Sequence, residues 1–241
     1  MPGNVVIEMM SSEFILWRCL HGGPLTKQTV DQPRPHPHIP WDRFRTRNVP
    51  LLARLTETYG SCAVIARDGD QIVGQLRFYP KIVCTMAAPE PALCLQQAFP
   101  DGPADDFVQN DFPPLGQMAD KTLFVHCMMI GSPEQNDNPY QRKGIGSRMV
   151  RTLIDWARQQ GWSAVEAHAY ADLPCWYAGT GQAGRTFWEK LGFHMVESTM
   201  EPAFAEGGHK GFVETLLKEA ADRGVDADTA KTRYTMRLEL V

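Results

Sequence analysis

Hydrophobic residues recur with two different periods along this chain, and their order predicts strands that alternate with helices. Cys62–Ala66 and Gln71–Tyr79 are strand-like runs on either side of Asp68-Gly69. That dipeptide is typical of a tight hairpin turn, because Gly tolerates the positive φ that such a turn needs. Leu123–Ile130 is apolar on both faces, which indicates a strand near the centre of a sheet.

An amphipathic helix is predicted to follow this central strand and to reach Gln160. Its apolar stripe consists of Ile145, Met149, Val150, Leu153, Ile154 and Ala157. Gly161 ends the helix, and Ala164–Tyr170 then predicts a second strand. A strand, helix, strand unit of this kind pairs its two strands in parallel.

Shorter patterns predict the remaining elements. Early in the chain these are a first strand at Phe14–Cys19, an extended connector at Pro33–Pro40 and one or two helices within Trp41–Tyr59. Late in the chain they are a helix from about Gly184 to Lys190, a strand at His194–Ser198, a helix with apolar positions Phe212, Val213, Leu216, Leu217 and Ala220, and a closing strand that alternates Tyr234, Met236, Leu238 and Leu240 with polar residues. We expect one domain over 1–241, with insertions near 86–120, 131–140 and 201–232.

Composition limits the class of protein. The 241 residues are 43% hydrophobic, which is enough for a substantial core. The net charge of -4 and the pI near 6.0 argue against a surface that grips nucleic acid. The N-terminus lacks a basic stretch followed by an apolar block, and no apolar run is long enough to cross a bilayer. We therefore expect a cytoplasmic protein with no nucleic-acid and no membrane partner.

Cysteine and histidine spacing predicts no metal site. The 6 cysteines contain no CxxC pair. His36 and His38 lie near each other in the Pro-rich segment, but no third ligand stands close to them in the sequence. We expect reduced thiols and no bound metal.

The most informative segment is the turn Gln141-Arg142-Lys143-Gly144-Ile145-Gly146, which joins the central strand to the amphipathic helix. Glycines let the backbone approach a ligand closely, and the first amides of a helix have no partner within the helix. Those amides and the positive end of the helix dipole attract a phosphate or pyrophosphate group. No Gly-Lys-Ser/Thr follows the glycines, and Met149 stands where a Rossmann fingerprint needs Gly or Ala. The turn is therefore neither a Walker loop nor a Rossmann loop.

The spacing Gln-x-x-Gly-x-Gly between a strand and a helix resembles the acetyl-CoA signature of the GNAT superfamily of N-acetyltransferases. Two other features agree with it in the family's order. The Asp-Gly hairpin lies upstream, and Phe187-Trp188-Glu189-Lys190-Leu191-Gly192-Phe193 downstream is similar to the family's aromatic helix that ends in Gly-Phe. Together they span about Cys62 to Ser198.

This resemblance implies an α/β (α+β) fold, with a strongly bent mixed sheet, splayed central parallel strands and helices on both faces. It also implies acetyl-CoA as the acyl donor. Backbone groups of Met128, Met129 and Ile130 would pair with pantetheine, and one of their amides would polarise the thioester carbonyl. The residues expected to hold the pyrophosphate are Gln141, Arg142, Lys143, Gly144, Ile145, Gly146 and Ser147. Trp188 is expected to pack in the apolar wall beside the thioester.

The catalytic residues are harder to predict, because Trp188 stands where many family members carry a proton-donating tyrosine. Indole cannot act as that acid. By strand alternation Glu166 and His168 share a face, so either is a candidate base, with His126 on the neighbouring strand. Tyr177, expected in a loop, is the leading replacement acid.

Other sequence features leave the function partly open. Gly181 stands where the family often has an asparagine. A covalent route through Cys175 or Cys127 needs a partner that lowers the pKa of the thiol, and sequence order shows none.

Three functions stay open at this stage. The leading prediction is acetyl transfer to an amine by direct attack in a ternary complex. The alternatives are an acyl-CoA-binding sensor or scaffold without turnover, and a longer-chain acyltransferase with room beside Gly179, Gly181 and Ala183. The expected acceptor is a small amine or an amino acid, with a peptide amino terminus less favoured, and a homodimer remains open.

Overall fold

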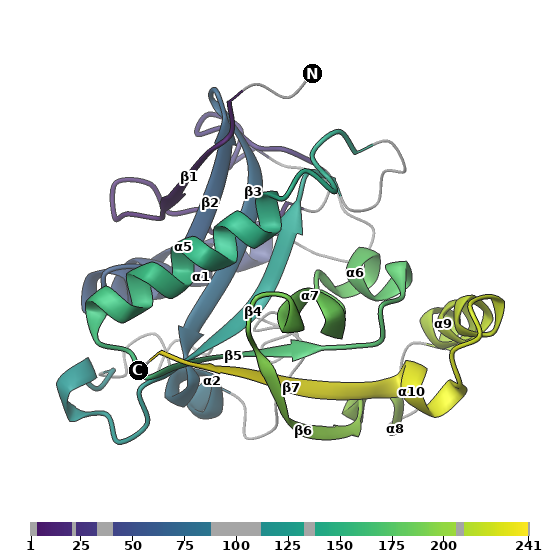
Figure 1. Cartoon of the computed structure of the whole chain (residues 1–241). Helices are drawn as coiled ribbons and strands as arrows, with labels where there is room; N and C mark the ends of the chain where they lie inside the picture. Colours follow the sequence, from purple (N-terminus) through teal and green to yellow (C-terminus); the bar gives the residue numbers. More distant parts are fainter. Residues whose placement is uncertain are drawn as a thin grey trace.

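The computed structural model describes residues 4–20, 23–32, 41–87, 112–132, 138–205 and 210–240. Within them a seven-stranded sheet has the order β1-β2-β3-β4-β5-β7-β6 (Figure 1). The strands are β1 (Val6–Met9), β2 (Ala63–Asp68), β3 (Gln71–Pro80), β4 (Thr122–Ile130), β5 (Ala164–Ala169), β6 (His194–Met200) and β7 (Thr232–Glu239). The helices are α1 (Trp41–Tyr59), α2 (Lys81–Ala87), η1 (Leu115–Gln117), α5 (Ile145–Gln160), α6 (Pro174–Thr180), α7 (Arg185–Glu189), α8 (Pro202–Ala205), α9 (Lys210–Asp222) and α10 (Ala227–Lys231).

The central strands β4 and β5 pair in parallel and then part, as predicted. Their pairing runs from Thr122 opposite Ala164 to Val125 opposite Ala167. Beyond Val125, β4 continues to Ile130 along β3 alone and diverges from β5 (Figure 1). All other neighbouring strands are antiparallel, so the sheet is mixed and open at its centre.

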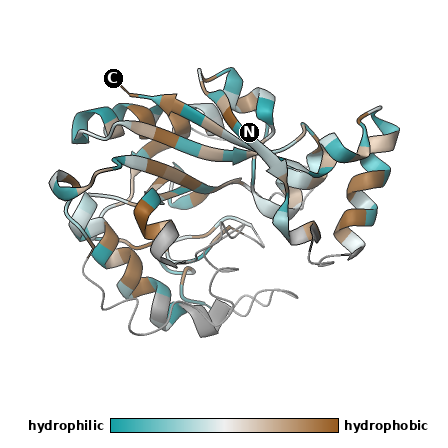
Figure 2. Ribbon diagram, turned by 90° about the horizontal axis from the view of Figure 1, so that it is seen from below, coloured by the Kyte–Doolittle hydropathy of each residue, from teal (hydrophilic) through white to brown (hydrophobic). Residues whose placement is uncertain are grey.

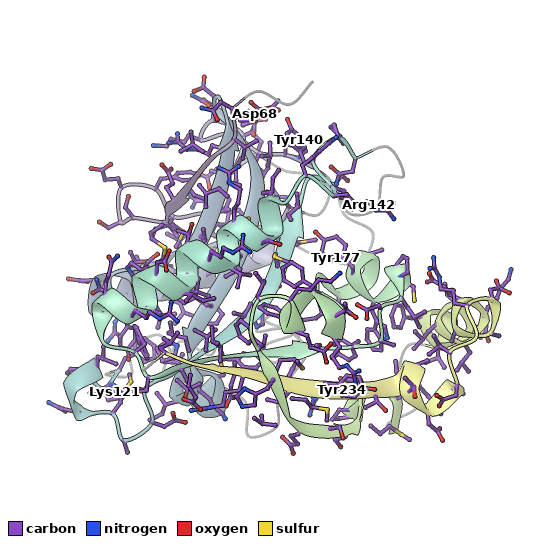
Figure 3. All side chains as sticks on the ribbon, in the orientation of Figure 1. Asp68, Lys121, Tyr140, Arg142, Tyr177 and Tyr234 are labelled. Atoms are coloured by element: carbon purple, nitrogen blue, oxygen red, sulfur yellow. The ribbon has the colours of Figure 1, made fainter. Side chains whose placement is uncertain are left out.

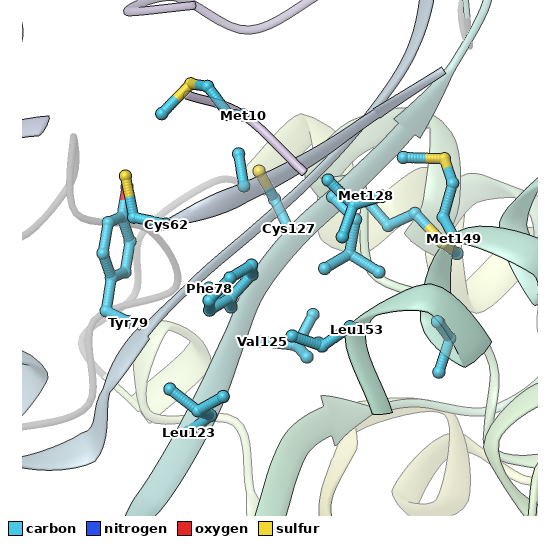
Figure 4. Packing of buried hydrophobic residues seen from close by; sticks show 14 of the residues in the cluster. Met10, Cys62, Phe78, Tyr79, Leu123, Val125, Cys127, Met128, Met149 and Leu153 are labelled. Carbon is cyan, nitrogen blue, oxygen red and sulfur yellow. The ribbon is translucent and has the colours of Figure 1, made fainter. Parts of the chain in front are cut away.

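A β-bulge in β4 lies at the point where the strands part. Arg77 of β3 pairs with Cys127, whereas Phe78 pairs with Val125, so His126 is an extra residue. Such a bulge bends the strand and shifts the alternation of its side chains. As a result Val125 and Met128 both lie beneath α5, near Leu153 and Met149 (Figure 4).

Helix α5 packs closely across this sheet, and its predicted apolar stripe is buried at all six positions. Two small residues allow the approach. A Cβ on Gly74 of β3 would lie 3.0 Å from Met149 Sδ, and one on Gly146 would lie 3.1 Å from Ile130 Cδ1. Gly161 ends α5 with a φ of 83°, which confirms the predicted C-terminus.

Helices cover both faces of the sheet (Figures 1 and 2). Helix α5 lies on one face, while α1 and α2 lie on the other (Figure 1). The predicted hairpin, the strand at 123–130, the parallel strand after Gly161, the helix before Gly192 and the closing strand are all present as β2–β3, β4, β5, α7 and β7. These elements confirm the α/β class and the bent mixed sheet.

A second, smaller core forms in the late part of the chain. Trp176 of α6 is buried, its ring stacks on Tyr170 at 3.8 Å between centroids, and its Nε1 donates to the carbonyl of Ala230 at 3.0 Å. Leu216 and Ala220, on the predicted apolar face of α9, close this cluster. Helix α9 and Ala230 of α10 are thus packed against α6.

Two predictions about local structure are wrong. Phe14–Cys19 is not a strand; its backbone is irregular, residues 16–19 are buried, and the carbonyl of Leu16 accepts from the guanidinium of Arg77 at 2.6 Å. Cys175–Tyr177, expected in a loop, belongs to α6, which begins at Pro174. Proline is favoured in the first turn of a helix, and the ring contacts of Trp176 hold this turn in place.

Some expected features lie outside the described residues. They are the Pro33–Pro40 connector, 88–111 of the first insertion and 133–137 of the second. Trp41–Tyr59 is a single helix that contains Pro50. Within the part of the chain that the structure describes, no helix combines the length and the apolar character needed to span a membrane.

Candidate functional site

The seven residues predicted at a pyrophosphate lie together in one turn and the first turn of α5. Gly144 is the N-cap with a φ of 72°, and it makes no side-chain capping bond. Arg142 also has a positive φ, 57°. Among the described residues it is the only non-Gly residue with a positive φ. Such a conformation is sparsely populated and is often kept at functional sites. The amides of Ile145, Gly146 and Ser147 belong to the helix end that has no carbonyl partner in its own helix.

The turn is accessible and basic. Arg142, Lys143 and Gly144 are exposed, and no atom lies within 4 Å of a Cβ built on Gly144. Arg142 points outward from the turn, away from the sheet (Figure 3). A charged phosphate group could therefore reach these amides without displacing a side chain of the described residues.

Asn138 fixes this turn to the end of β4, and the sequence reading missed it. Its Nδ2 donates to the carbonyls of Ile130 at 2.7 Å and Ser132 at 3.0 Å, and its Oδ1 accepts from the amide of Tyr140 at 3.1 Å. Gly131 has a φ of 62°, and a Cβ there would lie 2.1 Å from Asn138 Oδ1. The Gly-Ser pair after the strand and the Asn-Pro pair before the turn are the only local signals that could have pointed to it.

The three predicted strand residues, Met128, Met129 and Ile130, lie on the part of β4 that has left β5. Two of their amides already have partners from the chain itself. Met128 N donates to the carbonyl of Gly181 at 2.9 Å, and Ile130 N donates to the hydroxyl of Tyr177 at 2.9 Å. The strand half of the predicted donor site is thus occupied by residues from α6 and the segment after it.

Trp188 of α7 is buried at 1% exposure. Its ring lies 5.0 Å from that of Phe193 and 5.2 Å from that of Phe187, centroid to centroid. Its Nε1 is buried without a hydrogen-bond partner in the described residues. The indole is therefore an apolar packing group with one unsatisfied donor.

Glu166 is held by two cations. One carboxylate oxygen lies 2.7 Å from Lys81 Nζ and the other 2.7 Å from Arg237 Nη1, while the side chain is 5% exposed. Both carboxylate oxygens of Glu166 are therefore engaged in ion pairs.

His168 of β5 and His126 of β4 are both buried. The ring of His168 packs edge-on against Phe124 at 4.7 Å, and that of His126 against Tyr79 at 5.4 Å, centroid to centroid. Burial lowers the pKa of His168 to about 3, with Arg233, His126 and Lys81 acting in the same direction. Burial also lowers the pKa of His126 to about 4. Both imidazoles are neutral at pH 7.

Tyr177 is the candidate acid, and burial raises the pKa of its hydroxyl to about 12. The pKa of the Cys175 thiol is also raised to about 12, chiefly by burial and further by the hydrogen bond and negative charge of Glu219. A thiol with that pKa is not a thiolate at neutral pH, which argues against Cys175 as a nucleophile.

A separate hollow of about 390 Å³ lies on the β1 side of the sheet. Its wall includes Glu8, Phe14, Lys27, Arg67 and Ile72, and it contains none of the predicted site residues. Among the described residues no three His, Cys, Asp or Glu side chains group as metal ligands, and His36 and His38 lie outside them.

Comparison with protein families gives a match over the turn at 141–147 and the elements after it. Residues 136–193 match the acetyltransferase (GNAT) family. Over this segment the chain is similar to the GNAT acetyltransferases, whose class of activity is acyl transfer. The matched segment includes the turn at 141–147, α5, β5, α6 and α7. A search of curated proteins finds no match.

Solved structures similar to this chain include three acetyltransferases. An N-acetyltransferase from Staphylococcus aureus Mu50 is 12% identical with a TM-score of 0.48, over 99% of this chain and 100% of that one. Ard1 from Thermoplasma volcanium is 10% identical with a TM-score of 0.45, over 98% of each chain. A Bacillus subtilis acetyltransferase in complex with CoA is 12% identical with a TM-score of 0.38, over 74% of this chain and 76% of that one.

Proposed function

We propose that this protein is a GNAT enzyme that transfers an acetyl group from acetyl-CoA to an amine acceptor by direct attack in a ternary complex. One observation carries the proposal: the turn at 141–147, which is exposed at 142–144, stands at the end of β4, where β4 has parted from β5. A phosphate group at that turn leaves the rest of an extended donor directed toward the opening between the two strands. The donor, when bound, supplies a thioester whose carbonyl carbon accepts the amine.

The phosphate half of the site suits this donor as it stands. Free amides of Ile145, Gly146 and Ser147 can donate to phosphate oxygens, and the α5 dipole and the side chains of Arg142 and Lys143 add positive potential. Because Gly144 has no Cβ, the backbone can come within hydrogen-bonding distance of an anion.

The strand half of the site, on β4, can bind the donor only when the amides of Met128 and Ile130 no longer donate to other groups of the chain. The N–H groups of Met128 and Ile130 are aimed at the gap between the strands, where each now meets a group of the chain itself. A released amide there would stabilise negative charge on a carbonyl oxygen, as in an oxyanion hole.

We propose His168 as the base. Its imidazole is neutral and can accept a proton, and its low pKa makes it a weak base that acts through its position, whereas both carboxylate oxygens of Glu166 are engaged by Lys81 and Arg237. We propose that Glu166 holds Lys81 and Arg237 in place. Tyr177 is the proposed proton donor to the leaving thiolate, since the indole N–H of Trp188 can donate a hydrogen bond but does not release its proton.

The proposed acceptor is a small amine or an amino acid, with a peptide amino terminus as the less favoured alternative. A thiol-release assay with acetyl-CoA and a panel of such amines tests the proposal. We expect saturable turnover on at least one acceptor, together with CoA binding in calorimetry. The proposal would be overturned if CoA bound neither to the wild-type protein nor to the variants Tyr177→Phe and Gln182→Ala, which are described below.

The second candidate is an acyl-CoA-binding sensor or scaffold that does not turn over. It is favoured by the occupied amides of β4 and by Trp188 at the family's acid position. Tight CoA binding without thiol release on any acceptor would select it. A longer-chain acyltransferase is less favoured, because a Cβ on Gly179 would lie 2.8 Å from Phe212 and one on Gly181 3.3 Å from Met129, so neighbouring side chains fill that space. Competition between acetyl-CoA and longer acyl-CoAs tests this third candidate.

A further inference from the structure

The gap between the parted strands β4 and β5 is filled by a short piece of the chain itself. This piece is residues 181–184, which we call the wedge; it joins α6 to α7. Gln182 is 2% exposed and Ala183 is 6% exposed. The wedge is thus inside the molecule, in the place where the resemblance puts the pantetheine arm of the donor.

On the β4 side the wedge and α6 use the free edge of the strand almost completely. Gly181 O accepts from Met128 N at 2.9 Å, and Gln182 Nε2 donates to His126 O at 2.6 Å. Tyr177 Oη accepts from Ile130 N at 2.9 Å. Successive groups along the edge, from His126 to Ile130, therefore meet groups of 177–182 as they would meet a neighbouring strand.

On the β5 side the wedge continues the sheet. Gly184 forms a parallel bridge with Tyr170, and Arg185 N donates to Tyr170 O at 2.8 Å. One short piece of chain thus spans the gap from β4 to the end of β5. The contact with β4 is close: a Cβ on Gly181 would lie 3.4 Å from the carbonyl oxygen of Met128 and 3.3 Å from Met129 Cγ.

We infer that residues 177–184 are an autoinhibitory cover that competes with the acyl-CoA arm for the edge of β4. The inference rests on the proposed function, because it takes acyl-CoA as the ligand of that edge. An amide N–H that donates to Gly181 or Tyr177 is not available to a second acceptor, so the closed structure and the donor-bound strand exclude each other at these atoms. The cover must leave β4 before the donor can engage it.

The structure also shows where the cover is attached. Trp176 is fixed to the second core by its stacking on Tyr170 and its bond to Ala230, so α6 keeps its anchor when the cover moves. Glycines occur at 179, 181 and 184, and Gly181 has a φ of 69°. The movable part therefore lies between a fixed tryptophan and α7.

Two consequences follow for binding. The apparent affinity for CoA is lower than the affinity of the open form by the fraction of molecules that are open. The observed rate of CoA binding reaches a plateau at high CoA concentration when opening is slow. If the turn at 141–147 bound CoA without any cover, the observed rate of CoA binding would instead rise linearly with CoA concentration.

A disulfide can test the inference directly, because the chain already offers one of the two thiols. A Cβ on Gly181 would lie 3.7 Å from Cys127 Cβ, which falls within the Cβ separations found in disulfides. In Gly181→Cys, oxidation is expected to join the new thiol to Cys127 and to lock the cover on β4. We expect the locked protein to lose at least about tenfold in CoA affinity by calorimetry, and a reductant to restore it.

Matched controls separate the lock from its side effects. Gly181→Cys with Cys127→Ala, treated with the same oxidant, cannot form the disulfide and should bind CoA as its reduced form does. Gly181→Ser reports the strain of a side chain at a positive φ. CoA added before the oxidant should slow disulfide formation, which mass spectrometry measures without any turnover.

A second pair of variants covers the case in which Gly181→Cys does not fold. Tyr177→Phe removes the acceptor of Ile130 N, and Gln182→Ala removes the donor to His126 O. Each weakens the closed form by about one hydrogen bond, so CoA affinity should rise by up to about fivefold in each. The binding-rate plateau should rise as well.

The outcomes distinguish the inference from the proposed function. A locked protein that binds CoA as tightly as its reduced form overturns the cover and leaves the acyl-CoA assignment intact. Unchanged or weaker CoA binding in both Tyr177→Phe and Gln182→Ala also overturns the cover. No CoA binding by wild type, by the reduced Gly181→Cys protein or by either of these two variants overturns both.

Discussion

The side-chain amide of Asn138 donates to the backbone carbonyl of Ile130 at 2.7 Å. This bond joins the last residue of β4 to the start of the phosphate turn, across a loop whose residues 133–137 lie outside the described ranges. Because Asn138 also bonds Ser132 and Tyr140, one side chain sets the position of the turn relative to the strand. The two halves of the proposed donor site are therefore linked through Asn138, whose side chain bonds the carbonyls of Ile130 and Ser132 and the amide of Tyr140.

Replacing Asn138 should weaken CoA binding. Asn138→Ala removes three hydrogen bonds, and we expect CoA affinity to fall by about tenfold and the free energy of unfolding by about 1–2 kcal/mol. Calorimetry and urea unfolding measure the two effects. Asn138→Asp keeps the acceptor for Tyr140 but loses both donated bonds, so it should resemble the alanine variant. Wild-type affinity in both would show that the turn is positioned without this side chain.

Gly144→Glu should abolish CoA binding, because the new carboxylate blocks the backbone and repels phosphate. Gly161→Glu is a matched control at the other end of α5, since Gly161 also has a positive φ and open space around its Cβ position. Both changes should cost about 1 kcal/mol of stability from backbone strain. Only the first should change CoA affinity, by more than about 100-fold. Equal CoA affinity in the two variants would remove the turn from the site.

Stability should fall in mild acid through the two buried histidines. An unfolded histidine has a pKa of about 6.5, whereas burial lowers that of His168 to about 3 and that of His126 to about 4. Between about pH 6.5 and 4 the unfolded chain binds more protons at these sites than the folded chain does, so the free energy of unfolding rises with pH. Each imidazole contributes a slope of up to about 1.4 kcal/mol per pH unit in that window.

His168→Gln should flatten this dependence in urea unfolding series at pH 4.5 to 7. His194 lies on the exposed strand β6, so His194→Gln is the matched control for replacing a histidine. An identical slope in His168→Gln and wild type would mean that the pKa of the His168 imidazole is the same in the folded and the unfolded chain.

Turnover should depend on His168 more than on Glu166. We expect His168→Gln to lower kcat by about 100-fold with little change in the KM for acetyl-CoA, because it removes a proton acceptor. Glu166→Gln breaks two ion pairs, so its main effect should be a loss of about 2 kcal/mol of stability with a smaller fall in kcat. Steady-state kinetics beside thermal unfolding separates the two. A fall in kcat confined to Glu166→Gln would make Glu166 the base.

Trp188→Phe should retain turnover within about fivefold, since the indole does not supply a proton. Its stability should fall by about 1–2 kcal/mol because the smaller ring leaves space in a well-packed core. Tyr177→Phe should lower kcat by about 10² if Tyr177 protonates the thiolate, even where CoA binding improves. Equal kcat in Tyr177→Phe and wild type would show that the thiolate leaves without this acid.

The sequence alone determined the order of the main elements and predicted the phosphate half of the proposed site. The hairpin at Asp68-Gly69, the buried strand β4, the stripe of α5 and the stop at Gly161 are set by residues a few positions apart, and such short-range patterns are readable along the chain. The turn from Gln141 to Gly146 belongs to the same class, because its proposed function depends on its own backbone and on the helix that it opens.

The tertiary structure decided what depends on contacts between distant residues. Leu16 meets Arg77 across 61 positions, which draws Phe14–Cys19 into an irregular buried path in place of a strand. Ile130 meets Tyr177 across 47 positions, and His126 meets Gln182 across 56, so only the folded chain shows that its own residues occupy the edge of β4. A hydrogen bond of this kind leaves no periodicity in the sequence, because either partner could satisfy its polar group elsewhere until the sheet brings the two together.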